Sequence, residues 1–181
     1  IVGYVYLQEI LNESFFIFCT SKKESEELVR YKSEPNIKIL PLPFYSFENF
    51  AVTDKINVRE KYNIKKDDFV ILFMSRIDLK KGILFLIDAI NKLIQLEFNI
   101  HIIIAGSGDE KHLAEIKSRI NTYGIGNNIS FLGFIGNSIK KEIFSVSDLF
   151  VLPSLNENFG NVVIESLLYN LPVLISNQVY I

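Results

Sequence analysis

Residues 69–74 read Phe-Val-Ile-Leu-Phe-Met, and residues 100–105 read Ile-His-Ile-Ile-Ile-Ala. Between these two apolar runs, residues 82–96 carry apolar side chains at the spacing of an α-helix. The side chains predicted to face inwards are Leu84, Ile87, Ala89, Ile90 and Ile94. Unbroken apolar runs on either side of a helix are typical of parallel strands that are buried on both faces. This strand–helix–strand unit decides the fold class of the chain.

The alternation of strands and helices continues on both sides of this unit. Further strands are predicted at residues 15–19, 37–40, 129–132, 149–152 and 172–175. Further helices are predicted at residues 22–32, 57–62, 109–121, 138–146 and 161–169, the first of them capped by Thr20 or Ser21. The alternation predicts an α/β fold with a doubly wound parallel sheet. Right-handed crossovers then place the loops 76–81, 106–109, 133–136 and 153–160 at one edge of the sheet.

Composition excludes several classes of function. With 49% hydrophobic and 22% charged residues, the chain is typical of a globular protein, and no apolar run is long enough to span a membrane. The net charge of −2 argues against a nucleic-acid partner. The single cysteine, Cys19, lies in an apolar run and is interpreted as a buried structural thiol in a reducing compartment. Lys140 and Lys141 are interpreted as a solvated helix face.

The stretch from Pro153 to Glu165 reads Pro-Ser-Leu-Asn-Glu-Asn-Phe-Gly-Asn-Val-Val-Ile-Glu. It leaves an apolar strand, passes Glu157 in a polar loop, and enters the helix that carries Glu165. The glycine at the helix entry, Gly160, lets a ligand approach the backbone closely, and the first N–H groups of the helix are free to bind an anion. Carboxylates that accept from hydroxyls, beside a site for phosphate, suit a nucleotide-sugar.

Two cations follow the strand at residues 69–74. Arg76 can hold phosphate oxygens with its planar fork, and Lys81 can add a point charge, so the pair can neutralise a diphosphate. The alternative is a solvated basic loop. Gly106-Ser107-Gly108 follows the next strand, but Lys111 occupies the place of the third glycine of a dinucleotide fingerprint, so NAD is set aside. Gly106 can still let a nucleotide lie against the strand end.

The spacing of Glu157 and Glu165, with seven residues between them, resembles the E-x7-E motif of family 4 retaining glycosyltransferases, the glycosyl transferases of group 1. Pro153-Ser154 before the first glutamate and Phe159-Gly160 after it also match this family. The resemblance implies a GT-B fold. Residues 1–43 would close the N-terminal, acceptor-side domain, residues 44–56 would be a linker, and residues 57–181 would be a truncated nucleotide-sugar-binding domain. We therefore expect the sequence to be a fragment of a longer enzyme.

The resemblance also implies roles for single residues. Glu157, Arg76 and Lys81 would be catalytic, with Glu157 facing the transferred sugar and the two cations stabilising the departing diphosphate. Glu165 would bind the ribose hydroxyls. The other residues implied to bind the donor are Phe159, Gly160, Asn161, Gly106 and Phe134. Phe134 would lie against the base, and a core aromatic is the open alternative. For Glu165 the alternative is a first-turn acid that complements the helix dipole, and for Glu157 a polar loop residue.

The implied activity is transfer of a hexosyl-type sugar from a nucleoside-diphosphate sugar to a hydroxyl acceptor, with retention, in polysaccharide or glycoconjugate synthesis. The alternatives are a fragment or degenerate relative that binds nucleotide without catalysis, and a GT-B epimerase or phosphorylase. No cofactor or metal is expected, and His101 and His112 do not cluster with acids. The expected partners are the nucleotide-sugar and a glycan or lipid-linked acceptor. We expect a cytoplasmic location, with peripheral membrane contact left open.

Overall fold

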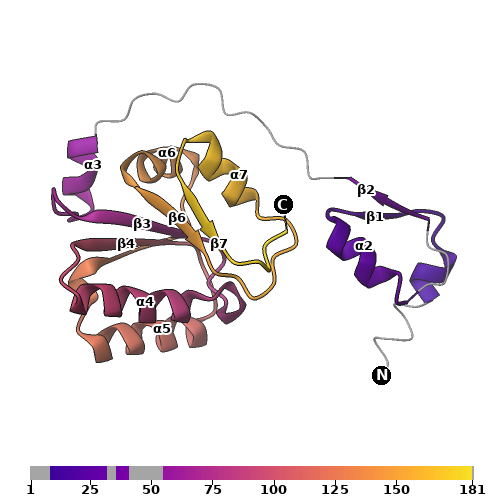
Figure 1. The fold of residues 1–181 in the computed structure, drawn as a ribbon, viewed down its shortest axis with the longest axis horizontal. Coiled ribbons are helices and arrows are strands. Elements are labelled where there is room, and N and C mark those ends of the chain that lie inside the picture. Colours follow the sequence, from indigo (N-terminus) through magenta and orange to yellow (C-terminus); the bar gives the residue numbers. More distant parts are fainter. Residues whose placement is uncertain (1–8, 32–35, 41–54, 181) are drawn as a thin grey trace. The chain divides into compact units, whose positions relative to one another are not determined.

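The computed structural model describes residues 9–31, 36–40 and 55–180, which form two compact units (Figure 1). One unit comprises residues 1–46, 157–160 and 179–181, and the other comprises residues 47–156 and 161–178. Most of the predicted linker lies outside the described residues, and its last two residues belong to helix α3 (Lys55–Lys61). The domain boundaries therefore stay a prediction.

The first unit contains two parallel strands, β1 (Ile17–Cys19) and β2 (Ile37–Ile39), and helix α2 (Lys22–Leu28). The hydroxyl of Ser21 caps α2 by accepting a hydrogen bond from the N–H of Glu24 at 3.2 Å. Ser21 is thus the cap, of the two candidates Thr20 and Ser21 that the sequence predicts. Cys19 is buried, as predicted. Burial, together with the charge of Glu24, raises the pKa of the Cys19 thiol, so the thiolate that would act as a nucleophile is disfavoured.

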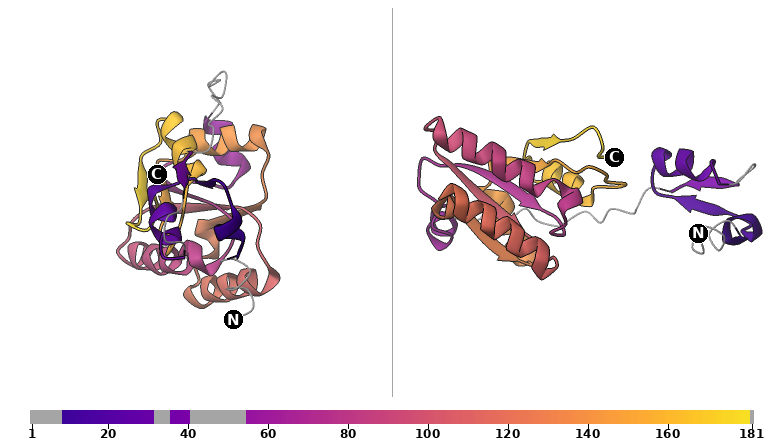
Figure 2. Two further views of the ribbon diagram at one scale, coloured as in Figure 1. Left: turned by 90° about the vertical axis from the view of Figure 1, so that its right-hand side faces the viewer. Right: turned by 90° about the horizontal axis from the view of Figure 1, so that it is seen from below.

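The second unit is built on a five-stranded parallel sheet with the strand order β5-β4-β3-β6-β7. The strands are β3 (Phe69–Met74), β4 (Ile100–Ala105), β5 (Ile129–Gly133), β6 (Leu149–Leu152) and β7 (Val173–Ile175). The other helices are α4 (Ile83–Gln95), α5 (Glu110–Tyr123), α6 (Asn137–Val146) and α7 (Asn161–Leu168). Helices α4 and α5 cover one face of the sheet, and α3, α6 and α7 lie on the other (Figures 1 and 2). The predicted doubly wound α/β fold is confirmed.

The face of α4 that packs on the sheet differs from the prediction. The buried residues of α4 are Ile83, Leu86, Ile87 and Ile90. Ile87 and Ile90 were expected there, but Leu84 is only half-buried and Ala89 is exposed. The helix begins with five consecutive apolar residues, so the spacing alone does not fix which of them face the sheet.

Asp148 has a structural role between helix α6 and strand β6. Its carboxylate accepts the backbone N–H of Val70 at 2.8 Å and lies 3.5 Å from the guanidinium of Arg59. Arg59 also donates to the carbonyl groups of Lys65 and Asp68. Asp148 therefore joins the start of β6 to β3 and to α3.

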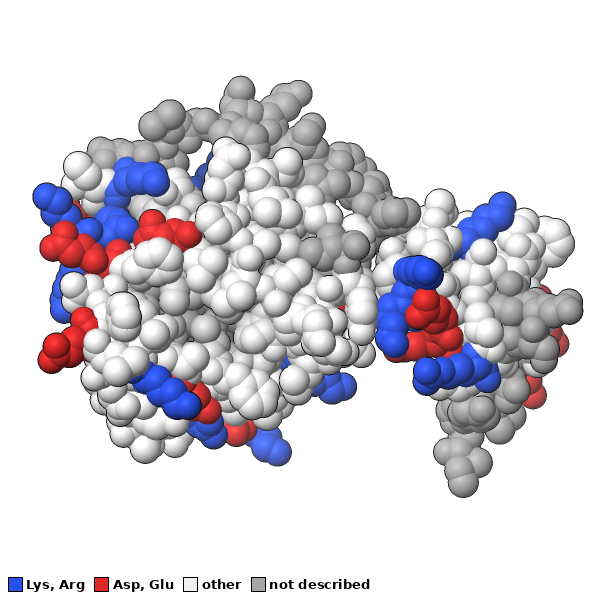
Figure 3. Space-filling model, viewed as in Figure 1, with Lys and Arg blue, Asp and Glu red and all other residues white. Residues whose placement is uncertain are grey.

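Strand order reverses between β3 and β6, which are neighbours in the sheet although two other strands lie between them in the chain. Ligands of open α/β sheets bind at such a point, beyond the carboxyl ends of the strands. On the face of the second unit shown in Figure 3, basic side chains lie beside acidic ones and form no large patch of one sign. In the described part of the chain, no helix is both long enough and apolar enough to cross a membrane.

His101 is buried in the sheet, with 2% of its surface exposed. Its Nε2 lies 2.8 Å from the hydroxyl of Ser130, which in turn donates to the carbonyl of Tyr62 at 3.1 Å. The ring therefore donates through Nε2–H. Burial lowers the pKa of His101, and this effect exceeds the opposing influence of Asp68. The imidazole is thus held neutral in the folded chain.

This lowered pKa predicts an acid-sensitive contribution to stability. Below about pH 6.5 the unfolded chain binds a proton at His101 that the folded chain does not bind, so the free energy of unfolding falls as the pH falls. From pH 7.5 to 5.5 we therefore expect His101 to contribute to a loss of stability. Urea unfolding at both pH values should show this loss in the parent and in His112→Gln, and a smaller loss in His101→Gln. Equal losses in the two variants would contradict the assignment.

Candidate functional site

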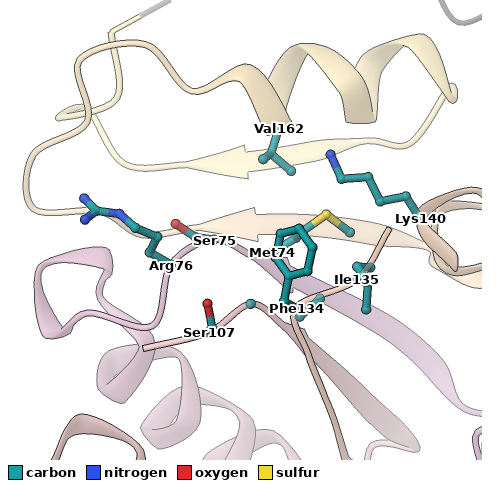
Figure 4. Close-up of a pocket in the computed structure, with 10 residues that line it drawn as sticks. Met74, Ser75, Arg76, Ser107, Phe134, Ile135, Lys140 and Val162 are labelled. Carbon is teal, nitrogen blue, oxygen red and sulfur yellow. The ribbon is translucent and has the colours of Figure 1, made fainter. Parts of the chain in front are cut away.

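A pocket of about 170 Å³ lies at the carboxyl ends of β3 and β4. Met74 and Ala105, the last residues of these strands, line it together with residues from the loop after β5 and from α6 and α7. Figure 4 shows Arg76 at one end of the pocket, Lys140 at the other, and the ring of Phe134 between them. An apolar centre between two cations suits a flat organic group that carries an anionic tail.

Gly106, which follows β4, lies in close contact with the backbone of Ser75, which follows β3. Its φ is +138°, and a Cβ built there would lie 1.8 Å from the carbonyl oxygen of Ser75. Only glycine fits this approach without displacing the backbone. Ser75 and Gly106 both line the pocket, so the absence of a side chain at Gly106 shapes its wall.

Arg76 and Lys81 are both in the segment that follows β3, but only Arg76 lines the pocket. Arg76 is exposed, whereas Lys81 is half-buried at the end of the 3-10 helix η1 (Leu79–Lys81). Asp78 caps η1 by accepting the N–H of Lys80 at 2.8 Å. This hydrogen bond is the main cause that lowers the pKa of Asp78, and the charges of Lys80 and Arg76 act in the same direction.

The loop after β6 is held against η1. The N–H of Leu155 donates to the carbonyl of Lys80 at 2.7 Å. Gly82 has a φ of +73°, and a Cβ there would lie 2.0 Å from the carbonyl oxygen of Pro153. The segment with Lys81 and the start of the Pro153–Glu165 stretch are therefore in direct contact, as expected for loops at one edge of a parallel sheet.

Phe134 lies in the loop after β5, and 83% of its surface is exposed. It lines the pocket with the neighbouring, buried Ile135. The alternative that Phe134 is a core aromatic is therefore wrong. An exposed aromatic ring beside an apolar pocket offers a surface on which a planar base can stack.

Glu165 forms an ion pair with Lys140, whose Nζ lies 2.7 Å from Oε2. The side chains of Lys140 and Glu165 are only 24% and 12% exposed. Lys140 also lines the pocket, and it extends from α6 towards Val162 on α7 (Figure 4). The interpretation of Lys140 as part of a solvated helix face is therefore wrong.

A second contact fixes α6 and α7 against each other. The rings of Phe144 and Tyr169 stack with centroids 4.6 Å apart and an angle of 16° between their planes. Phe144 follows Lys140 by four residues, and Tyr169 follows Glu165 by four, so the stack lies one turn beyond the ion pair. Burial raises the pKa of Tyr169, and the nearby charge of Glu165 adds to this effect. The pairing of Lys140 with Glu165 is therefore set by packing between the helices.

Glu157, Phe159 and Gly160 belong to the first compact unit, and Asn161 belongs to the second. Glu157 pairs with Val179 through an isolated parallel bridge, in which its carbonyl accepts the N–H of Tyr180 at 3.0 Å. Asn161 is the first residue of α7, as predicted, and it is exposed.

The structure thus brings Arg76, Gly106 and Phe134 together at one pocket, and Glu165 is linked to that pocket through Lys140. Lys81 and Asn161 do not line it. In the part of the chain that the structure describes, no group of three or more His, Cys, Asp or Glu residues is placed to hold a metal ion.

One sequence signal could have identified Lys140. It precedes the buried residues Ile143 and Phe144 by three and four positions, which places it on the inner face of α6. Side chains of a helix also lean towards its N-terminus, which in this fold is the end beside the carboxyl edge of the sheet. Both rules favour a site residue at Lys140 over a solvated one.

Comparison with known proteins identifies the family. The family model described as "Glycosyl transferases group 1" matches residues 54–181. The chain belongs to this family. An uncharacterised glycosyltransferase of Methanocaldococcus jannaschii is 31% identical over 170 residues, covering 91% of this chain and 43% of the relative. The alpha-monoglucosyldiacylglycerol synthase of Acholeplasma laidlawii is 26% identical over 160 residues, covering 86% of this chain and 39% of the relative.

Solved structures of GT-B glycosyltransferases share the fold of this group 1 chain. The crystal structure of Anabaena HepE in complex with UDP and glucose superimposes with a TM-score of 0.84 at 20% identity. The match covers 98% of this chain and 49% of HepE. The lipopolysaccharide glycosyltransferase WaaG gives a TM-score of 0.74 at 21% identity, over 90% of this chain and 44% of WaaG. The chain thus spans less than half the length of these relatives.

Proposed function

We propose that this chain is the donor-binding part of a glycosyltransferase that retains the configuration of the transferred sugar. The observation that carries the proposal is the pocket at the ends of β3 and β4, with Arg76 at one end and the Glu165–Lys140 pair at the other. A nucleoside diphosphate carries the groups that this arrangement suits: two phosphates, a ribose with two hydroxyls, and a planar base.

Different residues bind different groups of the donor. Arg76 holds the diphosphate oxygens, and Lys81, in the same segment, adds a second positive charge. Phe134 and the backbone at Gly106 border the base. Glu165 accepts hydrogen bonds from the ribose hydroxyls. The crystal structures of HepE contain UDP with glucose and UDP-glucose, which supports a nucleotide-sugar as the ligand.

Transfer makes one bond and breaks one. The bond between C1 of the sugar and the diphosphate oxygen breaks, and its electron pair remains on the diphosphate. The hydroxyl oxygen of the acceptor bonds to C1, and its proton passes to the departing diphosphate. Negative charge grows on the diphosphate as it departs, so Arg76 and Lys81 stabilise the transition state without a metal. The resemblance to the family assigns Glu157 to the transferred sugar and Phe159, Gly160 and Asn161 to the donor.

Glu165→Gln tests the site with an isosteric change. Calorimetric titration of the 181-residue chain with UDP, GDP, ADP and NAD should show binding of one nucleoside diphosphate and not of NAD. Glu165→Gln should lower that affinity about tenfold or more, because the amide replaces one acceptor oxygen by a donor.

Glu142→Gln is the matched control, since Glu142 also accepts from a lysine, Lys61, at 2.7 Å but lies outside the pocket. It should bind as the parent does. Equal affinities in the two variants would refute the role of Glu165, and a parent that binds none of the nucleoside diphosphates would refute the donor site itself.

A further inference from the structure

Lys140 and Glu165 form a more buried pair than Arg59 with Asp148, Lys61 with Glu142 or Arg119 with Asp88. For comparison, Lys61 and Glu142 pair at the same distance of 2.7 Å with side chains that are 51% and 29% exposed. A surface pair of this kind contributes little, whereas a partly buried carboxylate that loses its partner is strongly disfavoured. The position of the Glu165 carboxylate therefore depends on its ion pair with Lys140.

The position of the pair connects it to the pocket. Val162 and Glu165 are three residues apart on α7, so they lie on the same face of that helix. Val162 lines the pocket, and so does Lys140 from the opposite helix. The ammonium of Lys140 is thus at the end of the pocket remote from Arg76 (Figure 4).

We propose that Lys140 is a positioning residue that makes the site selective for ribose over deoxyribose. The inference rests on the proposed function of Glu165. Lys140 holds Oε2 of Glu165 in a fixed position, which leaves Oε1 to accept from the ribose. Phe144 in α6 stacks on Tyr169, the residue that follows α7, and this contact supports the spacing of the two helices across which the ion pair forms.

Selectivity follows from the cost of an unmatched polar group. A site built to bond a hydroxyl rejects an analogue without it, because a buried acceptor is then left unpaired. A carboxylate that is fixed by Lys140 cannot turn away to solvent when the 2′-hydroxyl is missing. A carboxylate released from Lys140 can do so, and its preference for ribose falls.

The test compares each nucleoside diphosphate, UDP, GDP or ADP, with its 2′-deoxy counterpart by calorimetric titration of the 181-residue chain. The parent should bind the ribonucleotide at least tenfold more tightly. Lys140→Met should lower the affinity for the ribonucleotide about tenfold and change that for the deoxyribonucleotide little, so that the ratio approaches one. Lys140→Arg, which keeps the charge and a donor, should retain most of the selectivity.

Lys141→Met is the matched control on the same helix and should keep both the affinity and the ratio of the parent. Thermal unfolding of every variant verifies that it is folded, and the double variant Lys140→Met/Glu165→Gln removes the charge imbalance of the single change. The ratio of the affinities for ribonucleotide and deoxyribonucleotide is then compared among the double variant, Lys140→Met and Glu165→Gln. If all three have the same low ratio, Lys140 and Glu165 act as one unit, as proposed.

Other outcomes separate this inference from the proposed function. If the parent binds a ribonucleotide selectively and Lys140→Met keeps the same ratio, the role of Lys140 is wrong and the donor site stands. If Lys140→Met lowered the affinities for the ribonucleotide and the deoxyribonucleotide equally, the proposed role of Lys140 would also be wrong. Lys140 would then contribute to binding without distinguishing ribose from deoxyribose. A parent that binds no nucleoside diphosphate would overturn both proposals.

Discussion

Replacing Gly106 with alanine is expected to lower the free energy of unfolding by about 2–6 kcal/mol. A φ of +138° costs an L residue about 1–3 kcal/mol. The new Cβ would also lie 1.8 Å from the carbonyl oxygen of Ser75, which is a backbone atom, so the end of β3 must move at a further cost of about 1–3 kcal/mol. A loss of this size is a large part of the stability of a typical domain.

Gly124→Ala is the matched control for this prediction. Gly124 also has a positive φ, +67°, but a Cβ there has no atom within 4 Å. Gly124→Ala should cost only about 1–2 kcal/mol, from backbone strain alone. Urea unfolding of the two variants and the parent separates strain from collision. A cost at Gly106 no greater than that at Gly124 would show that the close approach to Ser75 is not present in solution.

Phe150→Ala should lower the free energy of unfolding by about 3–5 kcal/mol. Phe150 lies on β6 with none of its surface exposed, between Leu72 on β3 and Val173 on β7. Removing its ring leaves a cavity on one face of the sheet, between the strands and the helices that cover that face, and close packing there cannot be restored without moving these elements.

Phe134→Ala provides the comparison, because Phe134 is 83% exposed. We expect its stability in urea to stay within about 0.5 kcal/mol of the parent. Its affinity for the nucleoside diphosphate should fall, since the ring borders the pocket. A large loss of stability in Phe134→Ala, or a small one in Phe150→Ala, would contradict the burial of these two rings.

The central strands could be predicted from sequence because their apolar runs are unbroken and flanked by polar residues. The bounds of β3, β4 and β6 agree with the prediction residue for residue. Helix ends differ by one or two residues in most cases, since helix termini depend on capping contacts as well as on spacing. The inner face of α4 could not be predicted, because Leu84 and Phe85 are as apolar as their buried neighbours Ile83 and Leu86.

Part of the candidate site could be predicted from the sequence for a similar reason. Arg76 and Gly106 directly follow predicted strands, so the topology of parallel sheets places them at one edge. The pair of Lys140 and Glu165 joins residues 25 positions apart on different helices, and such a contact has no local pattern. The spacing of Lys140 from Ile143 shows which way it faces, but the partner is known only once α6 and α7 are packed.

The strand order has a consequence for how the sheet assembles. Ile71 of β3 pairs on one side with Ile102, 31 residues later, and on the other side with Leu149, 78 residues later. The entropy lost on closing a loop grows with its length, so β4 can join β3 sooner than β6 can. During synthesis, β3, β4 and β5, three of the five strands, can therefore pair first, and one edge of β3 stays open until residues 149–152 arrive. That open edge can pair with another chain before β6 covers it.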